Sequence, residues 1–166
     1  MINAQDLSDA FARNVMVIKS QAEGLTHEDS LRQLPSGNSN CLNWVLGHIA
    51  ANRDAVLKTL GEEPVMGANG VRNKRGSDPV TAADEEGIQP LQELLNYLER
   101  TQERIAAALS KVNEDALSRE LTPEERYTQR TMTVGQQAFF LYFHESYHVG
   151  QTELFRQLAG KNDKII

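Results

Sequence analysis

The stretch His144-Glu145-Ser146-Tyr147-His148-Val149-Gly150-Gln151 lies near the end of the chain, in an apolar and aromatic segment typical of a long helix. Four residues are slightly more than one helical turn, so the two histidines project from the same side of such a helix. Their imidazoles then lie close enough to bind one metal ion. This stretch therefore predicts a helix that carries a pair of metal ligands.

A third ligand has to come from elsewhere, and the chain offers few choices because it has only four histidines. His27 lies in a polar segment, whereas His48 lies on the apolar stripe of a predicted helix, one turn after Trp44. A buried imidazole without a partner costs free energy. We therefore predict that His48, His144 and His148 bind one metal ion together.

Three neutral imidazoles suit several divalent ions, and the general order of affinities does not choose among them. We expect Zn²⁺ or Ni²⁺, with Fe²⁺, Co²⁺ and Cu²⁺ left open. Structural zinc sites are usually closed by four protein ligands, while catalytic sites keep a position for water. A site of three histidines is of the open kind, and its ion would lower the pKa of a bound water or thiol. No catalytic residue beyond the ligands can be named from the sequence.

Two other kinds of metal site are disfavoured. The spacing of Glu145 and His148 also fits the Glu-x-x-His motif of di-iron bundles, but those bundles need the motif on two helices, and Val45 stands three residues before His48. An iron site of two histidines and one carboxylate needs the carboxylate on the histidine face. Glu145 points about 100° away from His144.

Three further residues are candidates with two interpretations each. Gln151 could hold a ligand or a water, or make an ordinary helix hydrogen bond. Asn52, four residues after His48, could support that ligand from behind or be a satisfied buried amide. A helix terminus could lower the thiol pKa of Cys41, but no neighbouring base is apparent, and an inert cysteine is favoured.

Periodic apolar residues and capping residues predict four long helices. Their expected ranges are 3–23 after Asn3, from Ser39 or Asn40 to 60–61, from Pro90 to about 109, and 133–159 after the capping box Thr133-Val134-Gly135-Gln136. Segment 25–40 is predicted to be a loop, and 113–118 a short helix. Segment 112–132 is otherwise polar, although Arg126 and Tyr127 could reach the mouth of a site.

The segment between the second and third helices, 61–89, contains five glycines and two prolines and shows no sustained period. Most connections in compact domains are about 4 to 6 residues long, so this one is long enough to run the length of a bundle. It predicts an all-α fold: a four-helix bundle with a long crossover loop that lets helices two and three point the same way. We expect residues 1–166 to form one domain.

The composition excludes several classes of function. A net charge of −6 argues against a nucleic-acid-binding surface, and the basic cluster of residues 72–75 is small. No apolar run is long enough to span a bilayer, and the first residues lack the pattern of a secretion signal. The single cysteine cannot form an internal disulfide, so we expect a cytoplasmic protein. The last helix is apolar on most sides, which predicts a central place or an oligomer interface.

The segment Asn43-Trp44-Val45-Leu46-Gly47-His48-Ile49-Ala50, followed about a hundred residues later by His144-x-x-x-His148-x-x-Gln151, resembles the DinB-like (DinB/YfiT) superfamily of damage-inducible metalloproteins. The resemblance extends over nearly the whole chain in order and length. Its specific content is one helix with a single histidine and one with the histidine pair.

The resemblance implies a four-helix bundle, a divalent metal at His48, His144 and His148, and frequent dimerisation, so that a homodimer is expected. Characterised relatives include metal-dependent thiol transferases and hydrolases. We therefore expect an enzyme acting on a small molecule, with a low-molecular-weight thiol or water activated by the metal. The alternative is a non-catalytic protein of the stress response that binds a metal or another ligand. A third interpretation has the histidines satisfied in the core without metal.

Overall fold

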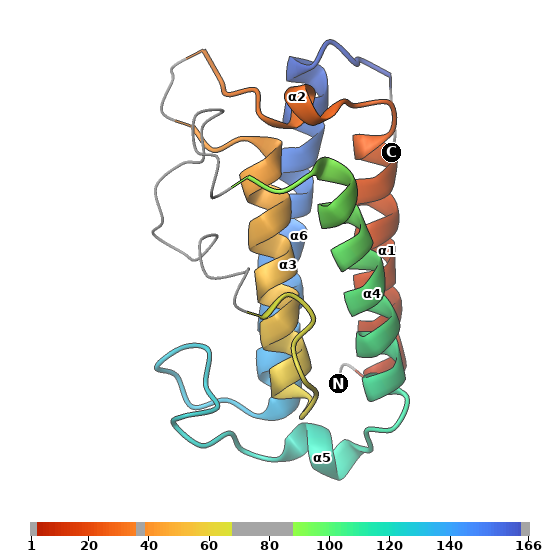
Figure 1. Cartoon of the computed structure of the whole chain (residues 1–166). Coiled ribbons are helices and arrows are strands. Elements are labelled where there is room, and N and C mark those ends of the chain that lie inside the picture. Colours follow the sequence, from red (N-terminus) through yellow and green to blue (C-terminus); the bar gives the residue numbers. More distant parts are fainter. Residues whose placement is uncertain (1–2, 36–38, 68–87, 164–166) are drawn as a thin grey trace.

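The computed structural model describes residues 3–35, 39–67 and 88–163, and the regular structure of these residues is helical. Four long helices, α1, α3, α4 and α6, lie side by side as a bundle, and two short helices cap its ends (Figure 1). The helices are α1 (Ala4–Ala22), α2 (His27–Ser30), α3 (Leu42–Thr59), α4 (Leu91–Leu109), α5 (Glu114–Ser118) and α6 (Val134–Leu158). The predicted all-α four-helix bundle is confirmed.

Helices α3 and α4 run in the same direction, both from the upper to the lower end of the bundle in Figure 1. Helix α6 runs against α3, since Gln137 near its start donates to Thr59 at the end of α3. Parallel neighbours need a long connection, and that need explains the crossover after α3. Residues 68–87 of the crossover lie outside the described part of the chain.

Two helices begin at the predicted caps. The side chain of Asn3 accepts a hydrogen bond from the backbone of Asp6 at 2.8 Å, which satisfies one of the first amides of α1. Thr133 and Gln136 form the predicted capping box of α6, each side chain bonding the backbone of the other.

Helix α3 begins later than predicted. Its N-cap is Cys41, whose side chain makes no capping hydrogen bond, so the proposed caps Ser39 and Asn40 were wrong. The hydroxyl of Ser39 instead accepts from the backbone of Leu34 at 2.8 Å. This local hydrogen bond competes with the cap and keeps Ser39 in the preceding loop.

Segment 25–40, predicted to be a loop, contains the one-turn helix α2. Thr26 and Asp29 form its capping box. The Thr-x-x-Asp spacing in the sequence was the signal for it. The predicted short helix near 113–118 is present as α5.

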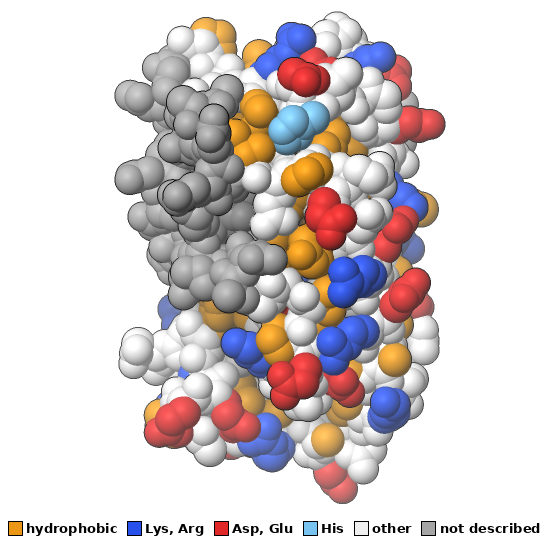
Figure 2. All heavy atoms as spheres, in the orientation of Figure 1, with side chains coloured by type: hydrophobic (Ala, Val, Ile, Leu, Met, Phe, Trp, Pro, Cys, Tyr) orange, Lys and Arg blue, Asp and Glu red, His pale blue; other side chains and the backbone are white. Residues whose placement is uncertain are grey.

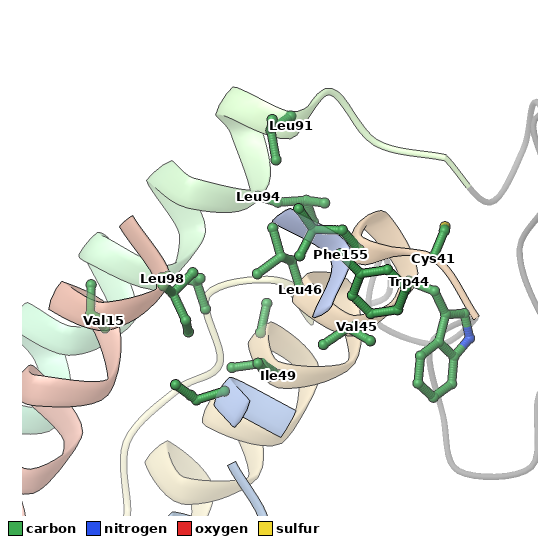
Figure 3. Packing of buried hydrophobic residues seen from close by; sticks show 14 of the residues in the cluster. Val15, Cys41, Trp44, Val45, Leu46, Ile49, Leu91, Leu94, Leu98 and Phe155 are labelled. Carbon is green, nitrogen blue, oxygen red and sulfur yellow. The ribbon is translucent and has the colours of Figure 1, made fainter. Parts of the chain in front are cut away.

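Apolar side chains between α3 and α4 form much of the core at the end where both helices begin. Leu94 and Leu98 of α4 lie against Leu46 and Ile49 of α3 in Figure 3, and all four are fully buried. The indole of Trp44 points to the other side of α3, away from α4. One side of helix α3 therefore packs against α4 in the core, and another side, with Trp44, makes different contacts.

Helix α3, rather than α6, is the most enclosed element, because nearly all of its residues are buried, charged ones included. Helix α6 buries one side and leaves large apolar side chains in solvent. The most exposed are Phe143 and Tyr147, at 63% and 64% of their full area. A central place for the last helix, one of the two predicted outcomes, is not observed.

A buried ion pair joins α3 to α6 at mid-height. Arg53 is 0% exposed and Glu145 is 1% exposed, and the guanidinium donates two hydrogen bonds to the carboxylate, at 2.9 and 2.6 Å. A bidentate pair of this kind fixes both the distance and the relative orientation of the two side chains.

The same pair reaches the other two long helices. Arg53 also donates to the backbone oxygen of Phe11 in α1 at 2.9 Å and to the amide oxygen of Gln102 in α4 at 3.2 Å. Asn14 of α1 donates to Glu145 at 3.2 Å. The charges thus have partners from every helix of the bundle, which offsets the free energy of removing them from water.

We expect the Glu145→Ala variant to be less stable by about 3–5 kcal/mol, because it leaves the guanidinium of Arg53 buried without its anion. Urea unfolding at pH 7 measures the change. Replacing both partners, Arg53→Met with Glu145→Leu, should recover part of the loss. Glu153→Ala, at an exposed glutamate of the same helix, is the control, and equal effects of Glu145→Ala and Glu153→Ala would contradict the assignment.

Candidate metal centre

Three histidines lie close together between α3 and α6, nearer than the ion pair to the end of the bundle where α3 begins. The Nε2 atoms of His48 and His144 are 3.4 Å apart. The ring of His148 lies 4.8 Å from the ring of His48 and 4.7 Å from that of His144, centre to centre. One ligand atom from each residue lies within 4.8 Å of the others. The structure therefore brings together the three histidines predicted as ligands, and it leaves His27 apart in α2.

These distances fit a shared metal ion. Zinc binds imidazole nitrogen at about 2.0–2.1 Å with tetrahedral angles, which places two such nitrogens about 3.3–3.4 Å apart. The separation between His48 and His144 has this value. The ligand atom of His148 lies within 4.8 Å of the other two, so a small rotation of its side chain would bring it to the same ion. If each histidine were instead hydrogen-bonded separately in the core without a metal, the three rings would not need to lie this close together.

Gln151 lies behind His148 on the same helix. Its amide oxygen is 2.7 Å from Nδ1 of His148. An amide oxygen only accepts, so Nδ1 carries the proton and Nε2 keeps its lone pair. Burial lowers the pKa of His148 below the ordinary 6.5, against the opposing effect of this hydrogen bond. The imidazole is therefore neutral at pH 7 and able to bind a metal.

Two aromatic rings contact the imidazoles of the centre. Trp44 stacks on His48 with the ring centres 4.8 Å apart and the planes within 10°. Tyr147 lies edge-on to His148 at 5.3 Å. Stacking restricts the rotation of an imidazole, so Trp44 holds His48 in its orientation toward α6.

The loop before α6 reaches the edge of the centre. Asn52, one turn below His48, donates to the backbone oxygen of His48 at 2.7 Å and accepts from the hydroxyl of Tyr127 at 2.6 Å. Of the two loop residues predicted to reach the mouth of a site, Tyr127 contacts Asn52, one helical turn from His48. Arg126 instead bonds Leu121 and Glu120 within its own loop.

Glu145 does not belong to the centre although it stands beside His144 in the sequence. Its carboxylate is turned into the bundle toward Arg53, as the predicted 100° offset requires. Arg53 follows His48 by five residues and so lies off its stripe by helical periodicity, and the sequence analysis did not pair it with Glu145. The presence of a lone carboxylate on the inward side of an apolar helix was the signal for a buried partner.

Cys41 also stays outside the centre. It is buried, and burial raises the pKa of its thiol, so the interpretation as an inert cysteine agrees with the structure. Within residues 3–35, 39–67 and 88–163, the group that could hold an ion consists of the three histidines alone. A four-coordinate ion held by these three ligands would have one position without a protein ligand among these residues.

The comparison with known families agrees with this geometry. A model of the DinB superfamily matches residues 10–152, which include all three histidines. The chain belongs to the DinB superfamily. The match runs from within α1 into the last turns of α6, so it covers most of the bundle of this DinB protein and the residues between its helices.

A solved structure supports the same fold. The DinB chain is similar to the crystal structure of a conserved protein from Enterococcus faecalis, with a TM-score of 0.71 and 15% sequence identity, over 96% of this chain and 98% of the other. At this identity the likeness concerns the fold alone. A search of curated proteins finds no match.

Two observations concern the membrane and the surface charge. No helix among the described residues of the DinB chain has the length and apolar content needed to cross a bilayer. On the face shown in Figure 2, basic side chains lie next to acidic ones.

The only tryptophan of the chain, Trp44, offers a direct test of the centre, because it stacks on His48. We expect Zn²⁺ or Ni²⁺ to change the fluorescence of Trp44 at a stoichiometry of one ion per chain. The change should be lost when His48, His144 and His148 are all replaced by alanine.

His27→Ala is the matched control, since His27 is the remaining histidine of the chain and lies outside the centre. This variant should titrate like the unaltered protein. A response that survives in the triple variant, or disappears in the control, would contradict the assignment of the ligands.

Proposed function

We propose that this protein is a metal-dependent enzyme in which His48, His144 and His148 hold one divalent ion that activates a thiol or a water toward a small electrophile. Zn²⁺ or Ni²⁺ is the proposed ion, and a low-molecular-weight thiol is the proposed co-substrate. The observation that supports the proposal most directly is the convergence of three imidazoles, without a fourth protein ligand among the described residues. The DinB superfamily is associated with metals, which agrees with it.

The residues of the chain have distinct roles in this proposal. The three imidazoles would hold the ion through neutral nitrogen, and the bound ion would supply Lewis acidity that favours the deprotonated form of a thiol or water. Gln151 and Trp44 hold two of the imidazoles in orientation. Arg53 neutralises Glu145, and this ion pair prevents the carboxylate from turning toward the ion.

Metal analysis of protein purified without a histidine tag tests the first part of the proposal. We expect about one divalent transition metal ion per chain, lost together with binding in the triple His→Ala variant. Protein that contains no such metal and binds none on addition would exclude a metal-dependent function.

Turnover is tested separately, because the non-catalytic alternative also predicts a bound metal. We expect metal-loaded protein to accelerate the reaction of cysteine with 1-chloro-2,4-dinitrobenzene, and the metal-free protein and the triple variant to lack this activity. His27→Ala should retain it. If chelation leaves thiol transfer unchanged but lowers the free energy of unfolding by several kcal/mol, the metal stabilises the fold and the binding function is correct.

We also propose a homodimer formed through the exposed side of α6. Four large apolar side chains recur along this side and stay in solvent in the single chain: Phe139, Phe143, Tyr147 and Leu154. A symmetric pair of such helices would bury each stripe against its copy. The stripe borders the histidine face through Tyr147, so the interface would lie beside the metal centre.

We expect the protein to sediment as a dimer and the Phe143→Glu variant as a monomer, because a charge at the middle of the stripe opposes burial. Analytical ultracentrifugation at micromolar concentration measures the difference. Met16→Glu changes an equally exposed apolar residue on α1 and serves as the control. A monomeric unaltered protein, or equal dissociation in both variants, would refute this interface.

A further inference from the structure

Tyr127 lies one helical turn from the histidine centre, although it belongs to the loop before α6. Its hydroxyl donates to Oδ1 of Asn52 at 2.6 Å, and its ring lies 6.2 Å from the ring of Phe140, centre to centre. Asn52 follows His48 by four residues on α3, and Phe140 precedes His144 by four residues on α6. Because α3 and α6 are antiparallel, both positions lie on the same side of the centre, toward the end of α3. Tyr127 thus contacts both ligand-bearing helices about 6 Å along their axes from the histidines.

The backbone of the loop holds Tyr127 in this place independently of its side chain. The N–H of Tyr127 donates to the amide oxygen of Gln137 at 2.6 Å. The amide nitrogen of Gln137, which is buried, donates to the backbone oxygen of Glu125 at 3.0 Å and to the hydroxyl of Thr59 at 2.9 Å. None of these hydrogen bonds involves the phenol ring. A shorter side chain at position 127 therefore leaves the loop attached to α3 and α6.

An aromatic side chain lies on each side of the centre along α3 and α6. On the side where α3 begins, Trp44 stacks on His48 and its ring centre lies 6.5 Å from that of His148. On the opposite side lies Tyr127. Trp44 is buried and belongs to a helix, whereas Tyr127 is 38% exposed and belongs to a loop. Loops on a rigid scaffold commonly carry the residues that select a ligand.

We propose that Tyr127 is a specificity-determining residue, whose ring limits how far a molecule bound to the ion can extend along α3 and α6. The class of molecule accepted is then one whose metal-binding group carries only a small substituent on this side. Such a boundary discriminates by excluding the larger of two molecules that bind the metal in the same way. The inference rests on the proposed function, because it requires a metal ion at the three histidines with a position for an outside ligand.

Imidazole and 4-phenylimidazole test the boundary, because both bind a metal through the same kind of nitrogen and they differ in size. Each is titrated into the Co²⁺-loaded protein, and the visible absorption bands of Co²⁺ report binding without any assay of turnover. In Tyr127→Ala, 4-phenylimidazole should bind about 10-fold more tightly than to the unaltered protein, because the ring that excludes its phenyl group is absent. The affinity for imidazole should stay the same.

Two further variants serve as controls. Tyr127→Phe keeps the ring and removes the hydroxyl, so it should discriminate between the two probes as the unaltered protein does. Tyr97→Ala makes the same truncation on α4, outside the two ligand-bearing helices, and both affinities should stay unchanged. The melting temperature and the Co²⁺ affinity of each variant show whether the bundle and the histidine centre are intact.

Equal affinity of the unaltered protein and Tyr127→Ala for 4-phenylimidazole would overturn the inference and leave the proposed function in place. An equal gain in Tyr127→Phe or in Tyr97→Ala would overturn it too, since the ring of Tyr127 would not be the boundary. A Co²⁺-loaded protein that binds neither probe has no position for an outside ligand, and this result would also refute the inference. Protein that binds no Co²⁺, Zn²⁺ or Ni²⁺ would instead contradict the proposed function itself.

Discussion

The ion pair between Arg53 and Glu145 is the interaction on which the arrangement of the bundle depends. It is inaccessible to solvent, bidentate, and bonded to groups from α1 and α4 as well. Apolar side chains tolerate small shifts of one helix along another, but two buried charges do not, because a shifted pair would leave each charge without its partner. Since Glu145 is flanked by His144 and His148, fixing Glu145 against α3 also fixes the height at which those histidines face His48.

Three sides of helix α6 face different surroundings. At about 100° per residue, Glu145 faces the core, the histidine pair faces α3 at the edge of the bundle, and Phe143 and Tyr147 face solvent. This division explains why the helix is rich in apolar and aromatic residues without being central. It also keeps the one carboxylate on the inward side of α6, that of Glu145, apart from the histidine centre, because Arg53 neutralises it within the core.

Much of this could be predicted from residue spacing. Asn3 and the capping box at Thr133 predicted where two helices begin. The length of segment 61–89 predicted that α3 and α4 run in the same direction. Because the chain has only four histidines, His48 was the remaining candidate partner for the pair on α6. The start of α3 was wrong because a local hydrogen bond of Ser39 outweighs its propensity to cap. The sequence analysis did not single out Arg53, since periodicity describes one stripe of a helix and α3 is buried on nearly every side.

The candidate ligands come from two helices that are far apart in the sequence: His48 and His144 are separated by 96 positions, whereas His144 and His148 are one turn apart. The α6 pair is thus a local chelate that an isolated helix already presents, and His48 joins only when α3 docks. An ion bound by all three would act as a cross-link that closes a long loop of the chain. Such a cross-link would tie α3 to α6 near one end of the bundle, in addition to the ion pair at mid-height, and would make the docking of these two helices depend on metal.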